Sequence, residues 1–128
     1  MSELMDYGAY IIDLSNAMLD HPESLNDQQG QRIQMIHRRA VDFVTEFLQH
    51  ENASADRLLE YLNHDAQTPL RIILGNSQML LSGNCGELAV DYQEAVQEIY
   101  DCVFAIVEEV QQMRLDLQNF MESIGMLE

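Results

Sequence analysis

The sequence contains no lysine, and its six basic residues are all arginine. Against these stand 22 aspartate and glutamate residues, which give the 128-residue chain a formal net charge of −16 at neutral pH. An electrostatic field of this sign repels phosphate backbones and anionic membrane surfaces. We therefore expect neither nucleic acid nor a membrane as a partner. The simplest interpretation of the acidic surface is solubility, although it would also attract a protein with a basic patch.

Proline, glycine and cysteine are also scarce, at two, six and two residues. With 47% apolar residues, this composition predicts a packed core rather than a disordered chain. Cys85 and Cys102 stand outside any metal-binding spacing, so we expect reduced thiols. No apolar run approaches the roughly 18 residues of a transmembrane helix, and the first residues are acidic where a signal peptide is basic. The expected location is the cytoplasm.

Apolar residues recur at steps of three and four, which is typical of helices, and strand patterns are weak. The clearest run predicts a long helix over about 87–125. Its seam residues are Val96, Ile99, Val103, Ile106, Val110, Met113, Leu117, Phe120 and Ile124. Further helices are predicted over about 26–50 and about 54–82, with a shorter one before His21 and Pro22. The expected fold is all-α, with two helical hairpins forming a four-helix bundle.

The two hairpins are similar in sequence. A shift of 63 positions aligns residues 24–49 with the long C-terminal helix, matches the apolar seam and pairs Glu46 with Glu109. A tandem duplication would explain this similarity, and so would the general likeness of two amphipathic helices with the same heptads. On either interpretation the chain divides into an N-terminal hairpin, residues 1–50, and a second hairpin, residues 51–128.

Residues 64–69 read His-Asp-Ala-Gln-Thr-Pro, on the first helix of the second hairpin. This segment resembles the phosphoacceptor box of bacterial sensor histidine kinases: a histidine, an acid, two variable residues, threonine or asparagine, then proline. The resemblance to their dimerisation and histidine-phosphotransfer domain extends through the second hairpin to about Leu117. Ala66 and Gln67 depart from the leucine or methionine and the arginine that are common in the family. This departure concerns partner contacts more than chemistry.

The first hairpin carries no second box. When the segments before the two loops are aligned by a shift of 61 positions, Glu3 falls opposite His64 and Gly8 falls opposite Pro69. The other histidines lack the context of the box and are expected to be capping, seam-edge and surface residues: His21, His37 and His50. Only the second hairpin is therefore expected to hold a phosphoacceptor.

The helical phase of the box favours an accessible histidine. At about 100° per residue, His64 projects roughly 200° from the seam residue Leu62. An imidazole titrates near neutrality and can attack phosphorus, and Asp65 beside it can hold or deprotonate the ring. By resemblance, Thr68 positions the water that dephosphorylates a partner, and Pro69 is expected to bend the helix. His64, Asp65 and Thr68 are the predicted catalytic residues; the alternative is that His64 is an ordinary surface histidine.

Two functions fit these residues. In the first, the protein is a phosphotransfer module or phosphatase of two-component signalling, which exchanges phosphate between His64 and the aspartate of a response-regulator receiver domain. In the second, it is a non-catalytic module that binds a receiver or a kinase through its acidic face. Nearly all of the chain after the second hairpin's loop is one amphipathic helix, so phosphorylation by ATP would need a separate kinase. We expect no cofactor on this chain, because the receiver would carry the Mg²⁺ for transfer.

The second hairpin is expected to be longer than the first. Its overhang carries an apolar stripe formed by Leu58, Leu62, Met113, Leu117, Phe120 and Ile124. A large exposed stripe of this kind marks a surface that another chain covers. The sequence therefore predicts a homodimer joined through the overhang. The alternative is a monomer in which the connection around Glu51 to Ala55 folds back over the stripe.

Overall fold

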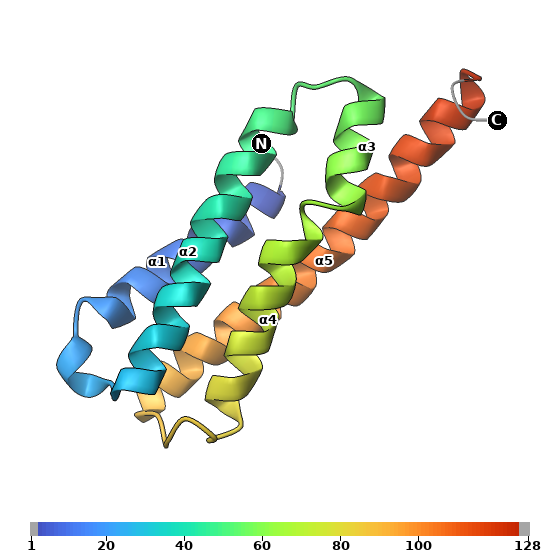
Figure 1. Cartoon of the computed structure of the whole chain (residues 1–128). Coiled ribbons are helices and arrows are strands. Elements are labelled where there is room, and N and C mark those ends of the chain that lie inside the picture. Colours follow the sequence, from blue (N-terminus) through green and yellow to red (C-terminus); the bar gives the residue numbers. More distant parts are fainter. Residues whose placement is uncertain (1–2, 126–128) are drawn as a thin grey trace.

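Helices account for most of the chain in the computed structural model, which describes residues 3–125 (Figure 1). In chain order they are α1 Glu3–Leu19, the 3-10 helix η1 Pro22–Ser24, α2 Asp27–His50, α3 Ala55–Asn63, α4 Gln67–Leu81 and α5 Val90–Ser123. No strand occurs between residues 3 and 125. The predicted all-α fold is confirmed.

The long helices form a four-helix bundle whose successive helices run in opposite directions (Figure 1). α1 packs against α2 and α5, and α4 packs against the same two helices, so the four enclose one core. α3 lies beyond the end of α4 and packs mainly against α5. α1 and α2 form the first hairpin, and α3, α4 and α5 form the second. This is the expected arrangement of two hairpins that share a core.

The seam predicted for the long C-terminal helix is confirmed over the part of α5 that faces the bundle. The buried residues there are Val96, Ile99, Val103, Ile106 and Val110. The prediction is wrong at the end of the helix, where Phe120 and Ile124 are each 52% exposed and Met121 is buried instead. The buried face changes because α3 is the helix that packs against this end of α5 (Figure 1).

α1 lies close to α2 because position 8 is a glycine. A Cβ atom at Gly8 would stand 2.6 Å from Cγ2 of Val44, closer than two carbon atoms can pack. Two turns later Ser15 is fully buried, and its hydroxyl donates to the carbonyl of Ile11 at 2.8 Å. The same hydroxyl lies 3.0 Å from Nδ1 of His37. Two small residues thus allow the close contact within the first hairpin.

The single helix predicted over about 54–82 is wrong. The segment forms two helices, α3 and α4, which are separated at residues 64–66. Pro69 lies in the first turn of α4 and supplies the reason. A proline ring clashes with the carbonyl four residues earlier, here that of Asp65, and it has no N–H to donate to that carbonyl. The helical ladder therefore stops one turn before Pro69, and the predicted bend is a complete break.

Candidate functional site

The break between α3 and α4 presents the residues of the predicted phosphoacceptor box. The N–H of His64 still donates to the carbonyl of Glu60 at 3.1 Å, but the N–H of Ala66 donates to the carbonyl of Tyr61, five residues back, at 2.9 Å. The side-chain amide of Gln67 donates to the carbonyl of Leu62 at 3.0 Å. Gln67 thus satisfies a carbonyl at the break, which gives a structural role to a position where the sequence departs from the kinase pattern.

The three predicted catalytic residues are all exposed at this break: His64, Asp65 and Thr68. Ala66, between them, is fully buried and anchors the segment to the core. His64 has a backbone φ of −122° and ψ of −73°, outside the helical region, so its side chain does not follow the phase of a continuous helix. The expected exposure of His64 is confirmed, although a helix end rather than a helix face provides it.

Two adjoining grooves of about 430 Å³ each flank the break on the side of α2. His64 and Asp65 line the first groove, together with Tyr61 and Arg57 from α3. Asp65 and Thr68 line the second groove, which faces residues of α2. His64 and Thr68 therefore lie on different grooves, and Asp65 is the predicted residue common to both.

Tyr61 and His50 form the wall between α3 and the end of α2. Their rings are stacked, with centroids 4.2 Å apart and planes 5° from parallel. Tyr61 is 2% exposed, yet its hydroxyl has no hydrogen-bond partner among residues 3–125. Burial raises the pKa of Tyr61 well above its ordinary value, and the carboxylates of Glu46 and Asp65 raise the pKa further. The group is therefore a neutral hydroxyl donor held beside the predicted site.

His50 is a site residue that the sequence analysis missed. It is half-buried and lines both grooves, rather than lying free on the surface as expected. Its Nδ1 lies 2.7 Å from the carbonyl of Glu46, and a carbonyl can only accept, so Nδ1 carries the hydrogen. Nε2 is then the basic nitrogen of the neutral ring. His50 meets Tyr61 because the chain turns between α2 and α3. No sequence motif indicates that turn.

Charges of both signs meet in the second groove. Arg39 donates from Nη1 to Asp42 at 3.0 Å, while its buried Nε has no partner in the described part of the chain. Glu46 has a pKa raised mainly by burial and then by the nearby carboxylates of Asp42 and Asp65, with His50 and Arg39 acting in the opposite direction. Each groove thus has one buried donor beside it, the Tyr61 hydroxyl at the first and the Arg39 Nε–H at the second, and neither has a partner within residues 3–125.

The side chains of the site suit proton and phosphoryl chemistry more than metal binding. No group of three or more histidine, cysteine, aspartate or glutamate residues within 3–125 is arranged to hold a metal ion. The arrangement offers one exposed imidazole with an adjacent carboxylate, one half-buried imidazole of defined tautomer, and donors from Tyr61 and Arg39. These groups can hold an oxyanion, accept a proton and present a nitrogen nucleophile.

No family model, no curated protein and no solved structure gives a significant match to this chain. The assignment of a function consequently depends on the chain's own residues and geometry. Among residues 3–125, no helix is both long enough and apolar enough to cross a membrane.

Proposed function

We propose that this protein is a histidine-phosphotransfer module of two-component signalling, in which His64 exchanges a phosphoryl group with the aspartate of a receiver domain. The observation that carries the proposal is the exposure of His64 and Asp65 at a helix break on a four-helix bundle, in the sequence context His-Asp-x-x-Thr-Pro. The break also places His64 on a groove that is lined by Tyr61, whose hydroxyl has no partner within residues 3–125.

The transfer step follows from the chemistry of the groups. A lone pair on an imidazole nitrogen of His64 attacks the phosphorus of an aspartyl phosphate. The bond from phosphorus to the aspartyl oxygen breaks, and the free carboxylate leaves on the receiver. Asp65 stabilises the charge that develops on the ring or removes the proton of its other nitrogen. The receiver would supply Mg²⁺ to neutralise the phosphoryl oxygens, so this chain needs no metal of its own.

The donors beside the break would assist by binding oxygen atoms. A phosphoryl or carboxylate oxygen in the first groove could accept from the Tyr61 hydroxyl, and one in the second groove could accept from the Arg39 Nε–H; neither donor has a partner within residues 3–125. Satisfying a buried donor removes a penalty of about 1–3 kcal/mol. Thr68 lies with Arg39 on the second groove. There it would position a water for hydrolysis on the receiver rather than act in the transfer itself.

Incubation with a phosphorylated receiver domain tests the proposal. His64→Ala should abolish the appearance of phosphate on this chain, while His21→Ala should leave it unchanged because His21 is also exposed but lies at the start of η1. Thr68→Ala should retain transfer and slow the hydrolysis of the receiver's phosphate. Equal transfer to wild type and to the His64→Ala variant would contradict the proposal. The absence of transfer to the wild type from every cognate receiver would contradict it as well.

The second candidate is a non-catalytic module that binds a receiver or a kinase. One observation favours it: Val41 and Leu48, two turns apart on α2, are exposed at 38% and 49% and offer apolar surface to a partner. Binding to a receiver without transfer would support this candidate. Under it, Leu48→Glu should abolish binding while His64→Ala has no effect, which separates the two functions.

The expected homodimer stays a prediction, with a smaller interface than the sequence suggested. Leu58 and Leu62 of α3 are buried within the chain, and Met113 and Leu117 of α5 pack against the core. α3 thus covers most of the predicted stripe and leaves Phe120 and Ile124 exposed. Light scattering at micromolar concentration should give twice the chain mass of 14.7 kDa, and Phe120→Glu should halve it with helicity retained. A particle of 14.7 kDa for the wild type would refute the dimer.

A further inference from the structure

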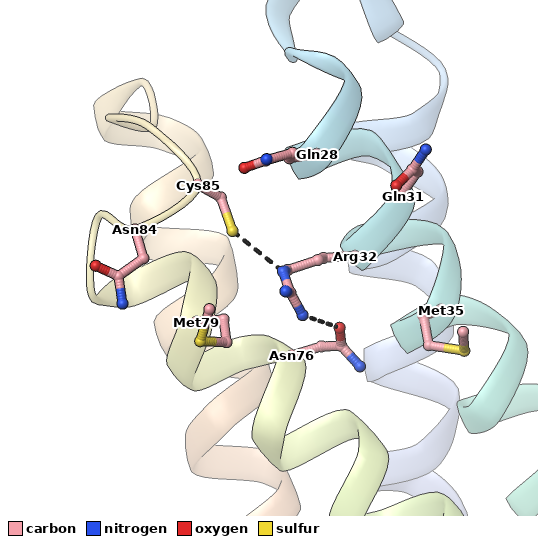
Figure 2. A pocket seen from close by; sticks show the side chains of 8 residues that line it. All are labelled: Gln28, Gln31, Arg32, Met35, Asn76, Met79, Asn84 and Cys85. Atoms are coloured by element: carbon pink, nitrogen blue, oxygen red, sulfur yellow. Dashed lines mark hydrogen bonds between the residues drawn. The ribbon is translucent and has the colours of Figure 1, made fainter.

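A separate cleft of about 490 Å³ lies at the other end of the bundle, between the start of α2, the end of α4 and the α4–α5 loop (Figure 2). Arg32 lies at its centre and reaches from α2 toward α4 and the loop (Figure 2). Eighteen residues of α2 separate Arg32 from His50, or about 27 Å at 1.5 Å per residue. The cleft is therefore distinct from the grooves beside His64.

The lining of this cleft contains no acidic side chain, although the chain has 22 of them. Arg32 instead bonds to two neutral groups: its Nε donates to the sulfur of Cys85 at 3.1 Å, and its Nη1 donates to the side-chain oxygen of Asn76 at 3.0 Å. Arg39, on the same helix, pairs with Asp42 at 3.0 Å. Arg32 forms no ion pair with any residue of the described chain, so its charge is uncompensated locally.

Both partners of Arg32 are themselves held in place. The side-chain nitrogen of Asn76 donates to the carbonyl of Ile72 at 2.8 Å, which directs the oxygen of Asn76 toward Arg32. The carbonyl of Cys85 accepts from the side chain of Asn26 at 2.7 Å, and this bond fixes the loop against the start of α2. The guanidinium is therefore positioned before any ligand arrives, so binding would not require it to be ordered.

Donors and apolar surface are both available to a ligand. A guanidinium has five N–H donors, and those of Arg32 that do not bond to Cys85 or Asn76 have no partner within residues 3–125. Two methionines, Met35 and Met79, also line the cleft (Figure 2). A half-buried cation without a counter-charge is unfavourable, and a carboxylate matches the planar guanidinium in charge and shape. Methionine side chains adapt to apolar groups of varied shape.

We propose that this cleft binds a small organic acid, whose carboxylate is held by Arg32 and whose apolar portion contacts Met35 and Met79. The net charge of the chain does not prevent this, because acids outside the lining are screened over a Debye length of about 8 Å at physiological salt. A phosphate ion would satisfy the charge of Arg32 but would leave the methionines without a partner. The carboxylate with an apolar tail is therefore the ligand that uses the whole cleft.

Titration of the full chain with sodium butyrate tests the proposal, with total ionic strength held constant by exchange against sodium chloride. We expect saturable NMR shifts of the backbone amides of Asn84, Cys85 and Gly86. Acetate, which lacks the apolar tail, and inorganic phosphate should each bind at least threefold more weakly than butyrate. Shifts that fail to saturate, or phosphate that binds as tightly as butyrate, would overturn the proposal.

Three variants assign the effect to the cleft. Arg32→Gln removes the charge, and Asn76→Asp supplies an internal carboxylate of nearly the same shape that competes with the ligand. Each should weaken butyrate binding at least tenfold. Arg38→Gln makes the same change of charge at an exposed position of α2 and should bind as the wild type does. Wild-type binding by folded Asn76→Asp would contradict the proposal even if Arg32→Gln failed to fold.

Discussion

The two hairpins of this protein differ at a pair of aligned positions, Gly8 and Pro69. In the first hairpin, Gly8 lets an unbroken α1 approach α2 at Val44. In the second, Pro69 stops the helix, and grooves open between the break and α2. The glycine allows two helices to pack closely, whereas the proline interrupts a helix and leaves grooves beside the break. The difference leaves α1 of the first hairpin continuous and places a helix break, with grooves beside it, in the second hairpin.

The largest expected effect is on the seam that both hairpins share. Ile106 of α5 is 1% exposed, so Ile106→Asp buries an unpaired charge and should cost several kcal/mol, enough to unfold the bundle. Phe104→Asp is the matched control, because Phe104 is 46% exposed on the same helix. Circular dichroism and thermal melting measure both. A folded Ile106→Asp variant with wild-type melting would refute the common core.

A pair of glycine substitutions tests the contrast between the hairpins directly. Gly8→Ala should destabilise the protein by about 1–2 kcal/mol, because the added methyl group overlaps the stiff side chain of Val44. Gly75→Ala in α4 meets no atom within 4 Å and should stabilise it by about 0.5–1 kcal/mol through helix propensity. Chemical denaturation gives both values. Val44→Ala should rescue Gly8→Ala; equal effects of the two glycine substitutions would contradict the close contact.

Pro69→Ala tests whether proline causes the break. The new N–H of residue 69 can donate to the carbonyl of Asp65, so the ladder should extend across residues 64–66 with a stability change of at most about 1 kcal/mol. Hydrogen exchange should show new protection there, and transfer to His64 should slow because its backbone geometry changes. Pro22→Ala, at the start of η1, is the control. If the break persists in Pro69→Ala, its cause is Gln67 and not the proline.

Local patterns were sufficient to predict the fold. Heptad spacing identified α2 and the buried part of α5, since a residue such as Ile99 faces the same core in any bundle of this class. Two predictions are wrong for different reasons. A proline within a helical pattern can bend a helix or end it, and the local pattern around Pro69 does not distinguish the two outcomes at residues 64–66. The buried face of α5 changes where α3 packs against it, and a heptad pattern does not contain the path of a distant helix.

The candidate site was only partly predictable for the same reason. The exposure of His64, Asp65 and Thr68 follows from their place in the box, but their division between two grooves depends on the break. His50 and Tyr61 meet because the chain turns between α2 and α3, so neither has a recognisable sequence pattern. The unpartnered donors of Tyr61 and Arg39 are properties of packing and cannot be seen in a linear sequence.

The smallest expected effect concerns Glu46, which the 63-residue shift aligns with Glu109 in the second hairpin. Burial, with Asp42 and Asp65 nearby, raises the pKa of Glu46 in the folded protein, so its charged form weakens the fold. The stability that the protonated group confers is present below its ordinary pKa of about 4.5 and is lost as pH rises through the raised folded value.

Glu46→Gln keeps the group neutral and should stabilise the protein by a few tenths of a kcal/mol at pH 7, since Glu46 is largely screened by solvent. The gain should shrink to nothing near pH 4. Urea denaturation across this range, with Glu109→Gln as the reference because Glu109 lines neither groove, measures it. A gain that does not change with pH would show that Glu46 acts through packing and not through the raised pKa of its carboxyl group.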